Sequence, residues 1–174
     1  NNRHFEISSG FPTLTLKWLN MTGGDAGSSN GGSILVDNAP AHLNISYCVF
    51  FKNHARWGGA VSANYGQPTM FFSSILFEYN SAEYHGGAVY LKGGTFHGKG
   101  NTFKKNAAAY DGGAIYICSG STASIYGSAF RKNTAVGAGG GILISNSQLN
   151  LTRVTLNENM QTVGGPMGQL GGGG

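Results

Sequence analysis

The chain has 174 residues, 40% of them hydrophobic and 11% aromatic, which is long and apolar enough for one folded core. Its 11 Lys and Arg against 7 Asp and Glu give a net charge of +4, too weak a bias for a nucleic-acid binder. The 30 glycines disfavour a helical bundle, because glycine costs entropy inside helices and is typical of tight turns.

Two short motifs recur in phase along the chain. Two glycines, a small residue and an aliphatic residue return at steps of 27, 28, 26 and 27 residues, beginning at Gly31, Gly58, Gly86, Gly112 and Gly139. The motif Phe-x-x-Asn begins at Phe50, Phe77, Phe103 and Phe130, with a variant at Leu156. Two motifs in phase over five copies indicate a structural unit of about 27 residues.

Each unit predicts three short strands. Apolar residues precede the phenylalanine position by seven, five and two residues, as in Leu43, Ile45, Cys48 and Phe50. The spacing of two within each pair indicates a strand, and the odd step between the pairs indicates a bend. A third strand follows the glycine pair, where Val89 and Leu91 alternate with an outward Tyr90.

Such units bury their apolar faces only by stacking, which predicts a right-handed parallel β-helix of about six coils. Equivalent residues then form columns: a stack of phenylalanines in the core, and a ladder of hydrogen-bonded amides at Asn53, Asn80, Asn106, Asn133 and Asn159. We expect one domain over residues 1–163, with a degenerate first coil over 5–30 and regular coils over 31–163. A glycine-rich tail follows over 164–174.

A leucine-rich-repeat solenoid is the alternative, because Ile45-x-x-Cys48-x-Phe50-x-x-Asn53 also fits its frame at an allowed period. That fold commonly continues into a helix after asparagine. Here an alanine, a glycine pair and a β-branched strand follow, which favours the β-helix.

The paired signatures GGA[VI] and FxxN, at residues 58–61, 77–80, 86–89, 103–106, 112–115 and 130–133, resemble the repeats of the chlamydial polymorphic outer membrane proteins. The resemblance covers roughly residues 31–159, and the first coil departs from it with Met21-x-x-Gly24. It implies a passenger-type β-helix displayed outside the cell, with adhesion as the usual role, and it supplies no catalytic residues.

Catalysis on a β-helix of the pectate-lyase type would need clustered carboxylates, whereas the seven acidic residues are scattered. Stacking places His85 beside Asp111 and near Glu83. Such a histidine and carboxylate pair is more often a solvated surface pair than a catalytic acid and base. Cys48 and Cys118 lie about three coils apart, beyond disulfide reach, and they are too few for a zinc site. We therefore predict a non-enzymatic protein with no metal and no cofactor.

Two sets of side chains are candidates for contact with glycans or a cell surface. Lys104, Lys105, Arg131 and Lys132 would align with Lys52 as a basic stripe, interrupted by Glu78 and Glu158, which we expect to pair with Lys104 and Lys132 across coils. Trp57, Tyr84 and Tyr110 would form an aromatic ladder before the glycine pairs. The simpler interpretation is that the stripe faces water and the ladder is cross-strand packing.

Three glycosylation sequons begin at Asn20, Asn44 and Asn150, a number that the abundance of Asn, Ser and Thr explains by chance. All three asparagines take outward positions, where a glycan would not disturb the core.

The ends of the solenoid bear on assembly. The chain starts at Asn1 without an initiator methionine and carries no recognisable signal peptide, so we expect a processed or partial chain. It also has no apolar run of the roughly 18 residues that span a bilayer. No segment looks like a cap for the exposed strand edges, so we expect either a longer chain or end-to-end stacking of subunits into a filament. The sequence thus favours an extracellular or cell-surface structural or adhesive protein. The alternative is a carbohydrate-active enzyme or glycan-binding protein on the same scaffold.

Overall fold

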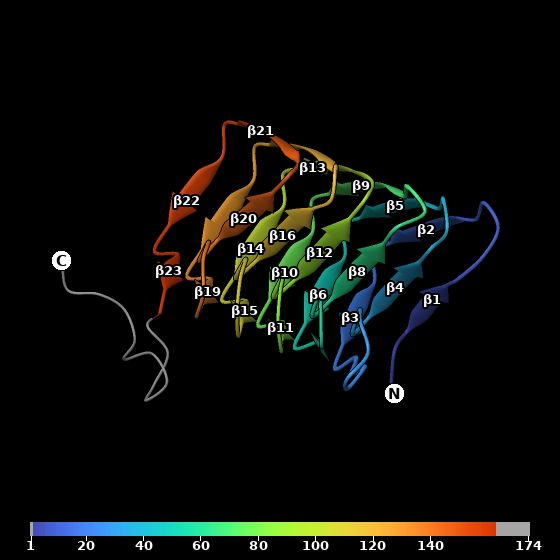
Figure 1. Cartoon of the computed structure of the whole chain (residues 1–174), viewed down its shortest axis with the longest axis horizontal. Coiled ribbons are helices and arrows are strands. Elements are labelled where there is room, and N and C mark those ends of the chain that lie inside the picture. Colours follow the sequence, from blue (N-terminus) through green and yellow to red (C-terminus); the bar gives the residue numbers. More distant parts are fainter. Residues whose placement is uncertain (1, 163–174) are drawn as a thin grey trace.

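The chain winds around one axis in successive coils, each of which pairs with the coils before and after it. The computed structural model describes residues 2–162, and these form an all-β solenoid of parallel strands (Figure 1). In Figure 1 the coils follow one another along the long axis in the order of the sequence. The predicted parallel β-helix is therefore confirmed, and the leucine-rich-repeat alternative is wrong.

Sheet A contains the strands that follow the glycine pairs. Its order in space is the order in sequence: β1 (Phe5–Ile7), β4 (Ile34–Asp37), β8 (Val61–Asn64), β12 (Val89–Lys92), β16 (Ile115–Cys118) and β20 (Ile142–Ser145). Sheet B holds the five-residue strands β2 (Thr13–Lys17), β5 (His42–Ser46), β9 (Thr69–Ser73), β13 (Thr95–Lys99), β17 (Thr122–Tyr126) and β21 (Gln148–Thr152).

Sheet C carries the phenylalanine column. Its strands are β3 (Asn20–Thr22), β6 (Val49–Phe51), β10 (Leu76–Glu78), β14 (Thr102–Lys104), β18 (Ala129–Arg131) and β22 (Thr155–Asn157). Phe77 lies opposite Phe50 in one neighbouring coil and Phe103 in the other, so equivalent residues of the repeat are in register.

A fourth sheet, which the sequence did not predict, follows the asparagines. Sheet D contains the two-residue strands β7 (His54–Ala55), β11 (Ser81–Ala82), β15 (Ala107–Ala108), β19 (Thr134–Ala135) and β23 (Met160–Gln161). The expectation of three strands per coil is wrong, because two residues are too few to show an alternating pattern. The first coil contributes only the isolated bridge between Asp25 and His54 to this side of the solenoid.

The two glycines of each pair are required for different reasons. Gly86 has φ +68°, and a Cβ there would lie 2.3 Å from the carbonyl oxygen of Val89 in its own coil. A Cβ on Gly87 would lie 2.2 Å from the carbonyl oxygen of Gly113 in the next coil. The first glycine therefore makes the turn, and the second lets adjacent coils approach.

The phenylalanine rings of sheet C form a continuous stack in the core. Ring centroids are 4.8 Å apart for Phe50 and Phe77, 4.7 Å for Phe77 and Phe103, and 4.6 Å for Phe103 and Phe130. All four rings are fully buried, whereas Leu156 in the last coil is 57% exposed. Among residues 2–162, the column of fully buried rings therefore extends from Phe50 to Phe130.

We expect Phe103→Ala to lower the free energy of unfolding by about 3–5 kcal/mol, because it leaves a cavity between two stacked rings. Chemical denaturation followed by circular dichroism measures this change. Phe71→Ala, which removes an exposed ring from β9, is the matched control and should cost less than about 1 kcal/mol. Equal losses in the two variants would contradict a role for the stack in stability.

Candidate binding surfaces

The asparagine ladder occupies the corner between sheets C and D. The Asn106 side chain donates from Nδ2 to Oδ1 of Asn133 at 2.9 Å and to the carbonyl oxygen of Phe77 at 3.0 Å. Its Oδ1 accepts from the backbone N–H and the Nδ2 of Asn80. Every polar group of this buried amide is therefore satisfied. The same arrangement repeats at Asn80 and Asn133, and Asn53 differs only in that its Oδ1 accepts from a backbone N–H alone.

The ladder has a direction, and it is incomplete at both ends of the described chain. Gly24 takes the asparagine position in the first coil and offers only its backbone N–H, which donates to Oδ1 of Asn53. Asn159, at the other end, donates from Nδ2 to the carbonyl oxygen of Phe130. Among residues 2–162 no acceptor meets the backbone N–H of Asn159, so hydrogen-bonding capacity remains there.

The His85 and Asp111 pair lies at the corner before the glycine pairs. Nδ1 of His85 is 3.3 Å from Oδ2 of Asp111, but the two groups are not aligned, and within the described range Nδ1 has no hydrogen-bond partner. Asp111 is engaged elsewhere, because its Oδ1 accepts from the backbone N–H of Ala138 in the next coil. Glu83 contacts His54 instead, at 3.9 Å. Asp111 and Glu83 thus contact different groups, and the side chains of His85, Asp111 and Glu83 do not meet at a common point.

Burial lowers the pKa of His85 below its ordinary value of 6.5, while the nearby Asp111 carboxylate acts in the opposite direction. The ring also packs on Tyr116, with centroids 4.6 Å apart, and lies tilted against Tyr84 and Tyr110. The neutral imidazole is therefore the form that the folded chain favours.

The predicted aromatic residues gather into a cluster that covers sheet A. Tyr84 and Tyr110 stack at 5.1 Å, and Trp57 meets Tyr84 edge-on at 6.5 Å. Trp57 also stacks on Tyr90 at 5.5 Å, which leaves Tyr90 only 5% exposed. The sequence placed Tyr90 outward, and it does point away from the core, but the corner loop folds over it. Much of this cluster is thus occupied with covering its own sheet.

Cys118 lies in the same layer. It is the last residue of β16 and is buried, with its Sγ 3.7 Å from the Tyr90 hydroxyl. Cys48 is buried in the core, and both cysteines are free.

The basic stripe is broken up by partners. Lys104 pairs with Glu78 at 2.8 Å and Lys132 with Glu158 at 3.3 Å, the two cross-coil ion pairs expected from the sequence. Lys105 donates to the Tyr79 hydroxyl at 2.6 Å, a bond that raises the pKa of this lysine. Arg131 is exposed on β18, in register with Lys104. The stripe therefore presents little concentrated positive charge.

The outer face of sheet B has a shallow hollow that the sequence did not reveal. It has a volume of about 370 Å³ and lies over β9, β13 and β17, between Phe71 and Tyr126 and beside His97, Lys99 and Ser124. Phe71 and Tyr126 are 46% and 40% exposed. Phe71 and Tyr126 lie in two different coils and belong to no repeated motif, so the only signal in the sequence was their outward position in the alternating pattern of each strand. A search for exposed aromatic residues at outward strand positions would have found them.

The three sequon asparagines also point outward. Asn20 is exposed on β3, Asn44 is partly exposed on β5, and Asn150 is exposed on β21. Asn44 lies opposite Phe71, so this side chain borders the hollow of sheet B.

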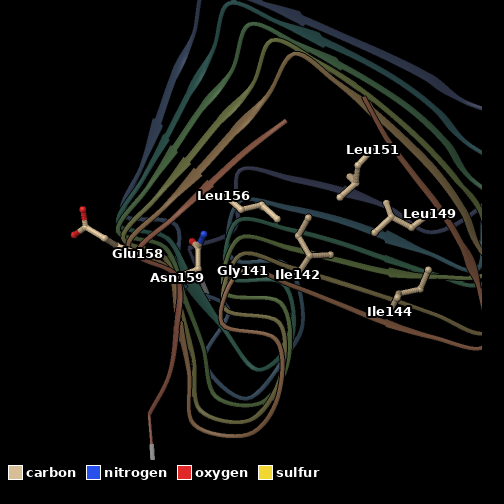
Figure 2. Close-up of a pocket in the computed structure, with 8 residues that line it drawn as sticks. All are labelled: Gly141, Ile142, Ile144, Leu149, Leu151, Leu156, Glu158 and Asn159. Carbon is tan, nitrogen blue, oxygen red and sulfur yellow. The ribbon is translucent and has the colours of Figure 1, made fainter. Parts of the chain in front are cut away.

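The C-terminal coil leaves a second hollow, of about 420 Å³, at the end of the core (Figure 2). Figure 2 shows the side chains of Ile142, Leu149, Leu151 and Leu156 turned toward the space that the last coil encloses, with Glu158 pointing away from it. These are the residues that another coil would cover. The tail predicted over residues 164–174 lies outside the described residues.

A family model for the Chlamydia polymorphic membrane protein repeat matches residues 74–92 and 102–118. The chain is a β-helix repeat protein that resembles these repeats. Each matched segment contains one Phe-x-x-Asn and one glycine pair, from two consecutive coils. No curated protein and no solved structure is significantly similar to the chain.

Residues 2–162 contain no helix long and apolar enough to cross a bilayer. Over the same residues, no three His, Cys, Asp or Glu side chains come together in a way that could hold a metal ion.

We expect Asn106→Ala to lower the free energy of unfolding by about 2–5 kcal/mol. The substitution removes the acceptor of the Asn80 backbone N–H and one of the two acceptors of its Nδ2, and it removes a donor to the carbonyl oxygen of Phe77. Each unsatisfied buried group costs about 1–3 kcal/mol. Denaturant titration measures the loss. The matched control is Asn159→Ala at the partly exposed end of the ladder, where water replaces the amide and the cost should be about 1 kcal/mol. A ladder of no energetic importance would give small and similar losses at both sites.

The pKa of His85 gives a pH dependence of stability. Because this pKa is lower in the folded than in the unfolded chain, unfolding takes up a proton at pH values below 6.5, and stability is lost as the pH falls. Thermal unfolding of wild type should therefore shift to lower temperature between pH of about 7.5 and 5, and His85→Gln should reduce that shift. His42→Gln, at an exposed position on β5, serves as the control and should leave the shift unchanged. A full shift in His85→Gln would contradict the assignment.

Proposed function

We propose that the chain is a non-enzymatic structural and adhesive β-helix that is exposed on the cell surface or outside the cell. The single observation that carries this proposal is the uninterrupted stack of repeats that resembles the Chlamydia polymorphic membrane protein repeat. The resemblance suggests a β-helix protein of the surface or outer-membrane type. A rigid solenoid of this kind presents outward columns of side chains at a spacing of about 4.8 Å per coil, which suits contact with extended ligands.

End-to-end assembly is the finer part of the proposal. The exposed Leu156 and Met160 side chains and the free backbone N–H of Asn159 lie at the C-terminal end of the described coils, where another coil would bury them. We propose the first coil of a second copy as this partner. The asparagine ladder would not continue across the contact, because Gly24 holds that position in the first coil. Apolar side chains and backbone groups would therefore carry the contact.

The second candidate is a carbohydrate-active enzyme or a glycan-binding protein on the same scaffold. The His85 and Asp111 pair is the observation that favours the enzyme, since a histidine 3.3 Å from a carboxylate is a recognised acid and base unit. The contact of Asp111 with Ala138 favours the structural role.

The experiment compares adhesion, assembly and catalysis with one preparation. Fluorescently labelled chain should bind cell surfaces saturably, and light scattering should show particle length rising with concentration. Leu156→Lys should abolish that rise, because it places a charge in the end contact, whereas Phe71→Lys on the lateral face should not. Incubation with polyuronates should release no products.

Two results would overturn the proposal. Polyuronate cleavage that is lost in His85→Ala or Asp111→Asn would establish the enzyme instead. A monomer at all concentrations, with no binding to any cell surface, would exclude both adhesion and assembly.

A further inference from the structure

The outer face of sheet B differs in charge from the rest of the surface. Its six strands contain no Asp or Glu, although the chain has 7 such residues. They contain Lys17 and Lys99, both exposed, and Arg153 follows β21. This face therefore carries positive charge without a paired acid. By contrast, Lys104 in sheet C pairs with Glu78, and Lys132, which follows sheet C, pairs with Glu158.

The hollow on this face is bounded by two aromatic rings that remain available. Phe71 stacks on His97, with centroids 4.8 Å apart and planes 12° from parallel, so each ring covers one face of the other and leaves its opposite face outside this contact. Arg153 donates from Nη1 to the Tyr126 hydroxyl at 2.6 Å, which holds the second ring in place beside a cation. The hydroxyl groups of Ser73 and Ser124 line the hollow between them.

Gly98 contributes only backbone to the floor of the hollow, because its side-chain position faces the core. Its inward position is filled from the core by Phe96, so that a Cβ on Gly98 would lie 3.1 Å from the Phe96 ring. The rings of Phe72 and Phe96 pack edge to face at 5.3 Å beneath it. A rigid core therefore supports the hollow, whose volume of about 370 Å³ falls within the range of about 300–1,000 Å³ of ligand pockets.

We propose that this hollow binds an acidic oligosaccharide, one that carries carboxylate or sulfate groups. The C–H face of a sugar ring packs against the negative face of an aromatic ring, and the ring faces that the Phe71 and His97 stack leaves uncovered offer this contact. Lys99 and Arg153 supply the positive charge that matches the acidic groups, and the serines offer hydrogen bonds to sugar hydroxyls. The inference rests on the proposed adhesive function and gives it a ligand class and a location.

Single-stranded nucleic acid is the rival occupant, since it also combines aromatic stacking with positive charge. Binding of single-stranded nucleic acid requires a basic groove that follows the phosphate backbone over several nucleotides. Here the cations beside the hollow are Lys99 and Arg153, and the net charge of the chain is only +4. The geometry therefore favours the saccharide.

The test measures dissociation constants of the full chain by calorimetry. The probes are a heparin hexasaccharide, a galacturonate hexasaccharide, neutral maltohexaose and a thymidine oligonucleotide. Wild type should bind at least one acidic hexasaccharide, bind it more weakly as salt is raised, and not bind maltohexaose. Heparin alone would identify sulfate as the recognised group, and galacturonate alone would identify the carboxylate.

Phe71→Ala and Lys99→Gln should each weaken this binding about tenfold, which corresponds to the loss of one good contact. Tyr110→Ala and Lys52→Gln are the matched controls, an exposed aromatic residue and an exposed lysine outside sheet B, and should leave the affinity unchanged. Circular dichroism verifies that each variant is folded.

The proposal is overturned if neither acidic saccharide binds, if the oligonucleotide binds more tightly, or if the four variants lose affinity equally. Cell binding separates this failure from that of the proposed function. Adhesion that persists in Phe71→Ala overturns the site and leaves the adhesive role standing. Saccharide binding without any adhesion supports the site and overturns the adhesive role.

Discussion

Stacking in register is the constraint on which the rest of this structure depends. Each residue of the repeat lies above its own equivalent, about one strand spacing away, so a buried side chain must be compatible with a copy of itself on both sides. Phenylalanine meets this condition by parallel stacking, and asparagine by donating to one neighbour and accepting from the other. A column of carboxylates in place of these asparagines would bring like charges together and would offer no donor.

The same constraint shapes the outer surface. Where side chains of opposite charge follow one another, as Glu78 and Lys104 do, the column neutralises itself. Where aromatic residues gather beside a corner loop, as Trp57 does over Tyr90, they close a second apolar layer. Sheet B has neither arrangement among residues 2–162, because its strands lack acids and outward side chains such as Phe71 and Lys99 stay exposed. Its outer face therefore remains available for binding.

Sequence reasoning predicted the features that repeat. The columns of Phe103 and Asn106, the cross-coil ion pairs and the turn at Gly86 all follow from the period. It missed sheet D, whose strands are too short for a pattern, and the cover over Tyr90, which depends on where a loop folds. It also missed the hollow at Phe71 and Tyr126, since these residues come from different coils and share no motif.

The sequence by itself thus determined the period, the parallel β-helix and the residues of its internal columns, because a repeated unit that cannot bury its own apolar face must stack on copies of itself. Only the tertiary structure decided which outward side chains stay exposed. That outcome depends on the path of each loop and on side chains brought together from separate coils. Trp57, Tyr84 and Tyr110, the aromatic residues selected from the sequence, are largely engaged in packing, and the better binding surface lies on sheet B.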